Sequence, residues 1–119
     1  MKIAISSQNK QTITGHAGKC RRFWIYETEN EVILSKELTE LKREDILHIR
    51  FHESKNPYAP HPLFEVDLII TGGAGKGFIN RLSGQGVTVL PTSETDPDKA
   101  VEKYFDGSLN VINPEPRHG

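Results

Sequence analysis

The stretch from Val66 to Gly77 constrains the fold more than any other part of this chain. Its apolar run, Leu68 to Ile70, is short, rich in β-branched residues and closed by glycines, which favours a buried strand. A helical spacing of apolar residues follows, at Phe78, Ile79 and Leu82, and then a second strand candidate, Val87–Leu90. A strand, a glycine turn, a helix and a strand predict a βαβ unit with parallel strands and a right-handed crossover.

The chain before this unit predicts three further strands. They lie at Lys2–Ser6, Arg22–Glu27 and Glu31–Ser35, and the last two form an antiparallel hairpin around a short polar connection. The segment Asp45–Glu53 fits a strand or a short helix equally well, because its apolar residues satisfy both periods. The proline-rich segment Ser54–Pro62 excludes a regular element there and predicts a loop.

A last helix is predicted to begin at Asp96, an N-cap residue that precedes a proline, and to end at Gly107. We therefore expect one α/β domain over residues 1–109, a mixed sheet of about five strands with flanking helices, and a polar tail over residues 110–119. A chain of 119 residues is long enough to bury roughly two-thirds of its unfolded surface.

Composition narrows the class of protein. The net charge of −1 argues against a nucleic-acid binder driven by bulk electrostatics. The single cysteine, Cys20, excludes an internal disulfide, and no run approaches the roughly 20 apolar residues of a membrane span. The polar residues that follow Met1–Ile5 do not fit a signal peptide, so we expect a cytoplasmic protein.

The glycine turn, Gly72–Gly77, is the first candidate site. Ligands of open parallel sheets bind beyond the carboxyl ends of the strands, and the N–H groups at a helix start favour an anion. Lys76 would add a charge, and Gly72, Gly73 and Gly75 would let a ligand approach the backbone. The sequence supports equally well a purely structural role, in which the glycines allow a tight turn and close helix packing.

Histidine and cysteine supply the second candidate site. His16 and Cys20 are four residues apart in the loop after the first strand, and imidazole and thiolate are ligands for zinc, iron–sulfur clusters and other borderline metals. Two ligands are too few for a closed structural site, and a buried cysteine beside a surface histidine is the simpler interpretation of the spacing.

Three more histidines crowd the middle of the chain, namely His48, His52 and His61. His48 and His52 share a face whether their segment is a helix or a strand, because their separation is four. The strands Lys2–Ser6, Asp67–Thr71 and Val87–Leu90 are expected to run parallel, so the loops that follow them emerge at the same edge of the sheet. His16, the glycine turn and the pair Thr92 and Ser93 would then line that edge. That edge suits a ligand that contains both metal and negative charge.

Three segments resemble the motifs of a known family and occur in the same order along the chain. Residues Thr14–Tyr26 are similar to the family's His-Phe-Gly-x-Cys-x-x-Phe-x-Ile-Tyr signature, with Ala17 in place of Phe. Residues Asp67–Gly77 resemble its strand and Gly-Gly-x-Gly turn, and residues Thr95–Tyr104 resemble its final helix. The family is that of dinitrogenase iron–molybdenum cofactor biosynthesis. The middle segment departs from many members, which have a loop rich in His and Gly there.

The resemblance implies a ribonuclease-H-like fold and a non-catalytic protein of nitrogen fixation that transiently binds an iron–sulfur or iron–molybdenum-type cluster. It also implies that the partners are metallocluster assembly or acceptor proteins, and that the protein binds neither nucleic acid nor a membrane. The protein is expected to be a monomer or a weak homodimer. His16 and Cys20 match the family's motif positions and are the first candidate metal ligands. His52 and His61 are further candidate ligands, and Thr92 is a candidate cofactor contact together with the glycine turn.

The fold and the glycine turn suggest two other functions. A nuclease of this fold needs clustered acidic residues for two metal ions, and the first strands contain none at the ligand edge. A small regulatory or scaffold domain that binds an anionic metabolite at the glycine turn is the better alternative.

Overall fold

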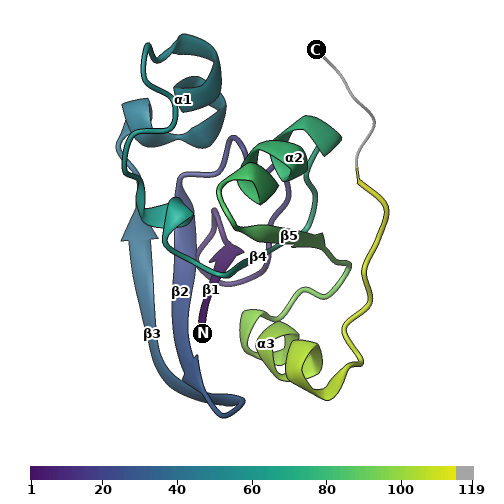
Figure 1. The fold of residues 1–119 in the computed structure, drawn as a ribbon. Coiled ribbons are helices and arrows are strands. Elements are labelled where there is room, and N and C mark those ends of the chain that lie inside the picture. Colours follow the sequence, from purple (N-terminus) through teal and green to yellow (C-terminus); the bar gives the residue numbers. More distant parts are fainter. Residues whose placement is uncertain (115–119) are drawn as a thin grey trace.

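In the computed structural model, which describes residues 1–114, a five-stranded mixed sheet lies between two layers of helices (Figure 1). The strands are β1 (Lys2–Ser6), β2 (Arg22–Glu29), β3 (Val32–Glu40), β4 (Leu68–Thr71) and β5 (Thr88–Pro91). The helices are α1 (Leu47–Glu53), α2 (Lys76–Gly84) and α3 (Pro97–Asp106), with short 3-10 turns at Arg43–Asp45 and Pro62–Phe64. The predicted α/β class is confirmed.

The strand order is β3-β2-β1-β4-β5. β1, β4 and β5 are parallel neighbours, in which Ile5 pairs with Ile70 and Ile70 with Leu90. β2 and β3 form the predicted antiparallel hairpin and attach to β1, also antiparallel. The carboxyl ends of the three parallel strands therefore lie at one edge, as the βαβ pattern predicts.

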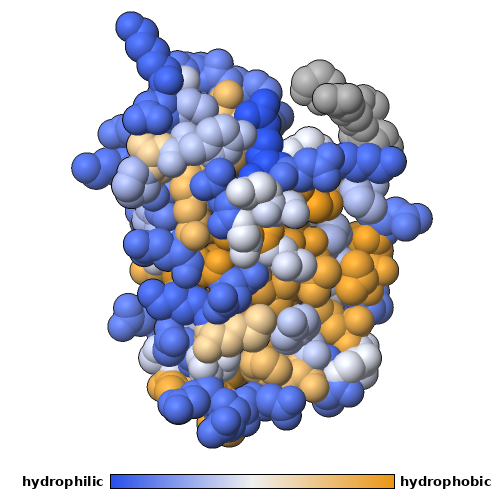
Figure 2. Space-filling view, in the orientation of Figure 1, coloured by the Kyte–Doolittle hydropathy of each residue, from blue (hydrophilic) through white to orange (hydrophobic). Residues whose placement is uncertain are grey.

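Each face of the sheet has its own core because alternate residues of a strand point to opposite faces. Ala4, Phe23 and Ile69 pack with α1 and α2 on one face. Ile3, Tyr26 and Ile70 pack with α3 on the other. Polar residues dominate the surface around α1, whereas apolar residues gather in the region of β5 and α3 (Figure 2).

Several element boundaries differ from the sequence prediction. The open choice at 45–53 resolves as a helix from Leu47, so the strand alternative is wrong. β3 continues to Glu40, beyond the predicted end at Ser35, because it pairs with β2 along its whole length. β5 begins at Thr88 and includes Pro91, whose missing N–H costs little at the last position of an edge strand.

The two ends of α3 follow the prediction. The Asp96 side chain accepts a hydrogen bond from Lys99 N at 3.1 Å, Pro97 occupies the first turn and Gly107 takes the left-handed conformation with φ 82°. The chain beyond α3 is held at its start, since Ile112 N donates to Pro91 O at 2.9 Å. The rest of the predicted tail, residues 115–119, lies outside the described residues.

Candidate functional site

The loop between β1 and β2, residues 7–21, runs across the carboxyl ends of the parallel strands. Gly72 N donates to Thr14 O at 3.0 Å, Ala17 N to Gly73 O at 3.1 Å and Ile13 N to Thr95 O at 2.8 Å. These bonds join the loop to the glycine turn on one side and to the loop after β5 on the other. The three segments predicted to meet at this edge do meet there.

The first half of the glycine turn serves this packing. A Cβ on Gly72 would lie 3.1 Å from Thr14 C and 3.2 Å from Gly15 N, so the backbone of the β1–β2 loop would have to shift by a few tenths of an ångström. Gly73 N donates to Thr71 Oγ1 at 3.3 Å, and Gly73 O accepts from Ala17 N. Because the N–H groups of Gly72 and Gly73 already have acceptors in the protein, the structural interpretation of these two glycines is the one that the contacts favour.

The second half of the turn is open to a ligand. Gly75 is the N-cap of α2 and has no side-chain hydrogen bond to cap the helix. A Cβ on Gly75 or Gly77 would meet nothing within 4 Å, and the Lys76 side chain is exposed. The first turn of a helix presents N–H groups that have no acceptor within the helix, so this end favours an anion.

Thr92 lies at the same edge but is 1% exposed. Its hydroxyl donates to Asn110 Oδ1 at 3.0 Å and accepts from Glu94 N at 3.1 Å. Those bonds fix the loop after β5, so the predicted contact of Thr92 with a cofactor would require this turn to rearrange.

Cys20 lies at the end of the same loop, and its thiol is buried. Sγ donates to Arg22 O at 3.0 Å and lies 3.6 Å from Gln8 Oε1. Burial raises the pKa of the Cys20 thiol, although hydrogen bonds to Arg22 and its neighbours partly offset that effect. A metal would reach this sulfur only if the loop opened, and the thiol would then have to lose its proton.

His61 is also buried, at 3% exposure. Leu63 N donates to Nδ1 at 2.9 Å, so Nε2 carries the proton and donates to Asp45 O at 2.7 Å. Burial lowers the pKa of His61, and the Asp45 carbonyl opposes that effect. Both ring nitrogens are thus hydrogen-bonded to backbone groups, and the predicted metal contact would have to replace one of these bonds.

His16 is exposed and has the left-handed backbone conformation, with φ 53°. Lys19 N donates to the His16 carbonyl at 2.8 Å, which closes a short turn. The next residue, Ala17, is fully buried against the glycine turn. The loop therefore holds the backbone of His16 firmly while its side chain faces outward, as a surface ligand requires.

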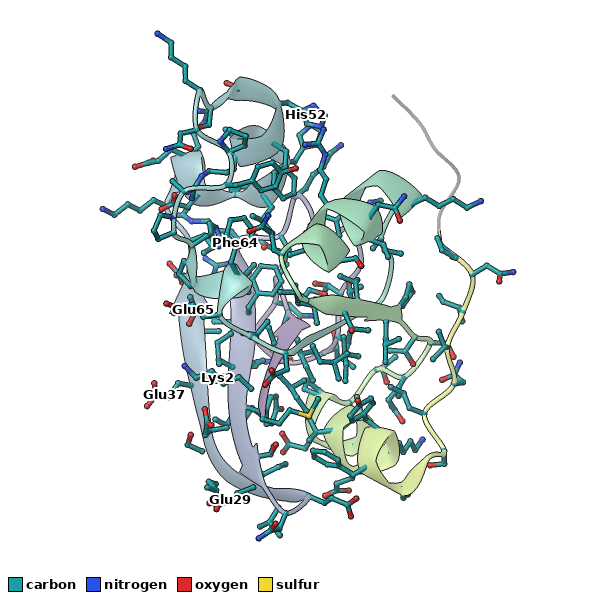
Figure 3. All side chains as sticks on the ribbon, viewed as in Figure 1. Lys2, Glu29, Glu37, His52, Phe64 and Glu65 are labelled. Atoms are coloured by element: carbon teal, nitrogen blue, oxygen red, sulfur yellow. The ribbon has the colours of Figure 1, made fainter. Side chains whose placement is uncertain are left out.

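His48 and His52 are one turn apart on α1, and their ring centroids are 4.6 Å apart. Figure 3 shows His52 on the side of α1 that lies toward α2 in this view. Burial lowers the pKa of His48, and the charges of His52 and Lys19 add to this effect, while Glu53 opposes it. The pair is thus confirmed as a pair on one helix face.

Gly18 joins this histidine pair to the rest of the site. His48 N donates to Gly18 O at 2.7 Å, and a Cβ on Gly18 would lie 3.4 Å from Phe78 Cδ2 and 3.9 Å from His48 Cβ. The start of α1, the β1–β2 loop and the first turn of α2 are therefore neighbours. We name the surface that they form the candidate surface. Its imidazole and positively charged side chains include those of His16, Lys19, His48, His52 and Lys76, and the negative charge of Glu53 also acts on His48.

Sequence reasoning did not single out Lys19. Its position between His16 and Cys20 was the signal that could have indicated it. Among residues 1–114, no group of three or more His, Cys, Asp and Glu side chains is placed to hold a metal ion. The candidate surface therefore has one single histidine, His16, and one histidine pair, His48 and His52, together with two lysines.

Comparisons with known proteins agree with this fold. The chain is 28% identical over 109 residues to an uncharacterized protein of Methanocaldococcus jannaschii, across 92% of this chain and 89% of that one. The apo form of the orange protein from Desulfovibrio gigas superposes with a TM-score of 0.68 at 15% identity, covering 98% and 96% of the two chains. The protein PH0822 gives 0.71 at 18% identity, covering 93% and 94%.

No helix in the described part of the chain is long and apolar enough to cross a membrane. The sequence itself matches the family described as dinitrogenase iron-molybdenum cofactor over residues 1–107, which include every strand and helix of the described residues 1–114. The chain therefore belongs to the dinitrogenase iron–molybdenum cofactor family.

Proposed function

We propose that this chain is a non-catalytic binding protein that carries an iron–sulfur or iron–molybdenum-type cofactor, or its precursor, during metallocluster assembly. The observation that carries the proposal is the candidate surface, where three separate elements bring exposed imidazoles and lysines beside an uncapped helix start. Family membership supports the class of cargo. The cluster is the cargo of the protein, which it receives and hands on.

Electrostatics favour such a cargo. A cluster rich in sulfide ligands carries negative charge, and Lys19, Lys76 and the start of α2 would stabilise that charge. An exposed lysine contributes up to about 1 kcal/mol to such an interaction, so several weak contacts would act together. The whole chain has a net charge of −1, so this favourable charge is local to the candidate surface.

The imidazoles would supply metal ligands. His16 and His52 are the exposed members of the predicted ligand set, and a neutral imidazole binds iron through a ring nitrogen. Gly75 and Lys76 would contact the anionic periphery. Cys20 and His61 would take part only after their backbone bonds broke, and Thr92 only after its turn opened.

A small number of protein ligands suits a carrier. A cluster that is enclosed by a full set of ligands leaves slowly, whereas one held at an open surface can pass to an acceptor protein. This proposal includes assembly or acceptor proteins as partners, in the cytoplasm, for a chain that is a monomer or a weak homodimer.

Anaerobic reconstitution with iron, sulfide and molybdate tests the proposal. We expect bound iron and a visible charge-transfer spectrum after desalting. We expect His16→Gln and His52→Gln each to lower the affinity for iron by about tenfold or more, because even the loss of a residue that only orients a metal ligand costs at least that much. A wild-type protein that retains no more iron than the double variant His16→Gln/His52→Gln would contradict the proposal.

Cys20→Ser belongs in the same series. From the sequence alone, we expect this change to weaken iron retention most, because it removes the only thiol in the chain. The buried position of Sγ predicts instead that retention is unchanged unless the loop opens on binding. Iron loss in a folded Cys20→Ser protein would show that the loop does open.

One observation favours a second function, a regulatory or scaffold domain that binds an anionic metabolite. The uncapped start of α2 with exposed Lys76 is an anion site in either case. Calorimetric titration with pyrophosphate, without iron or sulfide, separates the two. Saturable binding that Lys76→Gln removes, combined with no iron uptake, would support the metabolite binder.

A further inference from the structure

We infer that His48 and His52 form a bidentate site for a single divalent transition-metal ion, in addition to the proposed cluster site. The site lies on the outer face of α1, where both side chains are exposed. The inference uses His48, which the cluster proposal does not assign as a ligand, and it needs neither sulfide nor Cys20. The two proposals share His52.

The separation of the rings fits coordination of one ion. An imidazole nitrogen bound at roughly 2.0–2.1 Å places its ring centre about 3.2 Å from the metal, so two rings at about 90–109° have centres about 4.5–5.2 Å apart. The observed centroid separation is 4.6 Å. The rings are tilted by 54°, so they do not stack face to face.

The helix prepares this geometry before any ion binds. Residues four apart lie one above the other on a helix face, and the same spacing of two histidines holds zinc in helical metal sites. α1 is fixed at both ends of the pair, since His48 N donates to Gly18 O at 2.7 Å and Ser54 N to Arg50 O at 3.3 Å. Little ordering of the backbone is therefore needed on binding.

The donor set selects the class of ion. Imidazole suits Cu²⁺, Ni²⁺ and Zn²⁺, whereas Mg²⁺ and Ca²⁺ prefer oxygen. No third histidine, cysteine or carboxylate in the described residues completes a cluster with the pair, so water would fill the remaining positions. By the usual order of stability for divalent metals, Cu²⁺ would bind most tightly.

The test is titration of the metal-free protein with Cu²⁺, followed by calorimetry and by the visible d–d band of the bound ion. We expect one ion per chain, and a loss of affinity of about tenfold or more in His48→Gln and in His52→Gln, because either change leaves a single imidazole. Mg²⁺ should not compete. His118→Gln is the matched control, since it removes one histidine outside the pair.

A second control tests the spacing. The double variant His52→Gln/Glu53→His keeps two imidazoles on α1 but separates them by five positions, which places them on different faces. We expect it to bind Cu²⁺ no better than His52→Gln alone. Affinity within twofold of wild type in either His48→Gln or this spacing variant would overturn the inference.

The titration is independent of the cluster experiment. It contains no iron or sulfide, so failure to reconstitute a cluster leaves a positive Cu²⁺ result standing. Conversely, suppose that the protein takes up iron and sulfide but binds Cu²⁺ equally well with and without the His48→Gln change. That result would contradict the metal-ion site and leave the cluster proposal standing.

Discussion

Replacement of Gly72 by alanine should destabilise the protein, and the size of the effect follows from three contacts. The new Cβ would meet Thr14 C at 3.1 Å, Gly15 N at 3.2 Å and Thr14 O at 3.2 Å. All three are backbone atoms, and Gly72 N is itself bonded to Thr14 O, so the shift of a few tenths of an ångström that relieves these contacts would also distort that bond. Gly72 is not among the glycines with positive φ, so contact alone decides the cost.

Overpacking of this kind costs about 1–3 kcal/mol, and the lower entropy of an unfolded chain with alanine returns about 0.4–1 kcal/mol. The middle values of these two ranges, about 2 and about 0.7 kcal/mol, leave a net loss of about 1.3 kcal/mol in the free energy of unfolding. At an m value of about 2 kcal/mol/M, the urea midpoint should then fall by roughly 0.7 M.

Gly77→Ala is the matched control, because it lies inside α2 and its Cβ would meet nothing within 4 Å. Alanine in a helix is favoured over glycine by about 0.5–1 kcal/mol, so this variant should gain stability. Urea unfolding followed by circular dichroism measures both. A Gly72→Ala protein as stable as wild type, or a Gly77→Ala protein that is less stable, would refute the contact argument.

Two further predictions concern the buried titratable groups. The pKa of His61 lies below its usual value of 6.5 because of burial, so below about that pH the unfolded chain takes up a proton that the folded chain does not. The free energy of unfolding is therefore not reduced by His61 above this pH and decreases as the pH falls below it. In urea unfolding, His61→Gln should make the decrease between pH 7 and 5 smaller than in wild type. A slope equal to that of wild type would show that other groups cause it. The thiol of Cys20 should react with a neutral thiol reagent about 100-fold more slowly in the native protein than in denaturant, because it is buried and its pKa is raised; equal rates would mean that the loop is open in solution.

Local pattern was sufficient for most of the fold. The apolar run before the glycines predicted β4, the caps Asp96 and Gly107 predicted both ends of α3, and the βαβ order predicted parallel pairing. The choice at 45–53 could not be made from the sequence, because it depends on tertiary contacts such as the one between His48 and the loop at Gly18. The extent of β3 likewise depends on pairing with β2.

The candidate site was less predictable. Spacing correctly placed His48 and His52 together, since that inference holds for either type of element. Spacing alone does not reveal whether a side chain is buried, and His61 and Cys20 are both bonded to backbone groups from other positions in the chain. Burial of a histidine in a proline-rich loop has no local signature.

The way in which the β1–β2 loop is attached also makes it suitable for directed variation. Its anchoring bonds use main-chain atoms of Ile13, Thr14 and Ala17, so they do not depend on the outward-facing side chains. Position 19 could therefore be randomised in a library, and position 16 varied among Gly, Asn, Asp and His, which tolerate its left-handed backbone, while the buried and close-packed positions of the loop are kept. Selection of such variants on different metal ions would treat the sheet as a fixed scaffold and the loop as an interchangeable recognition segment.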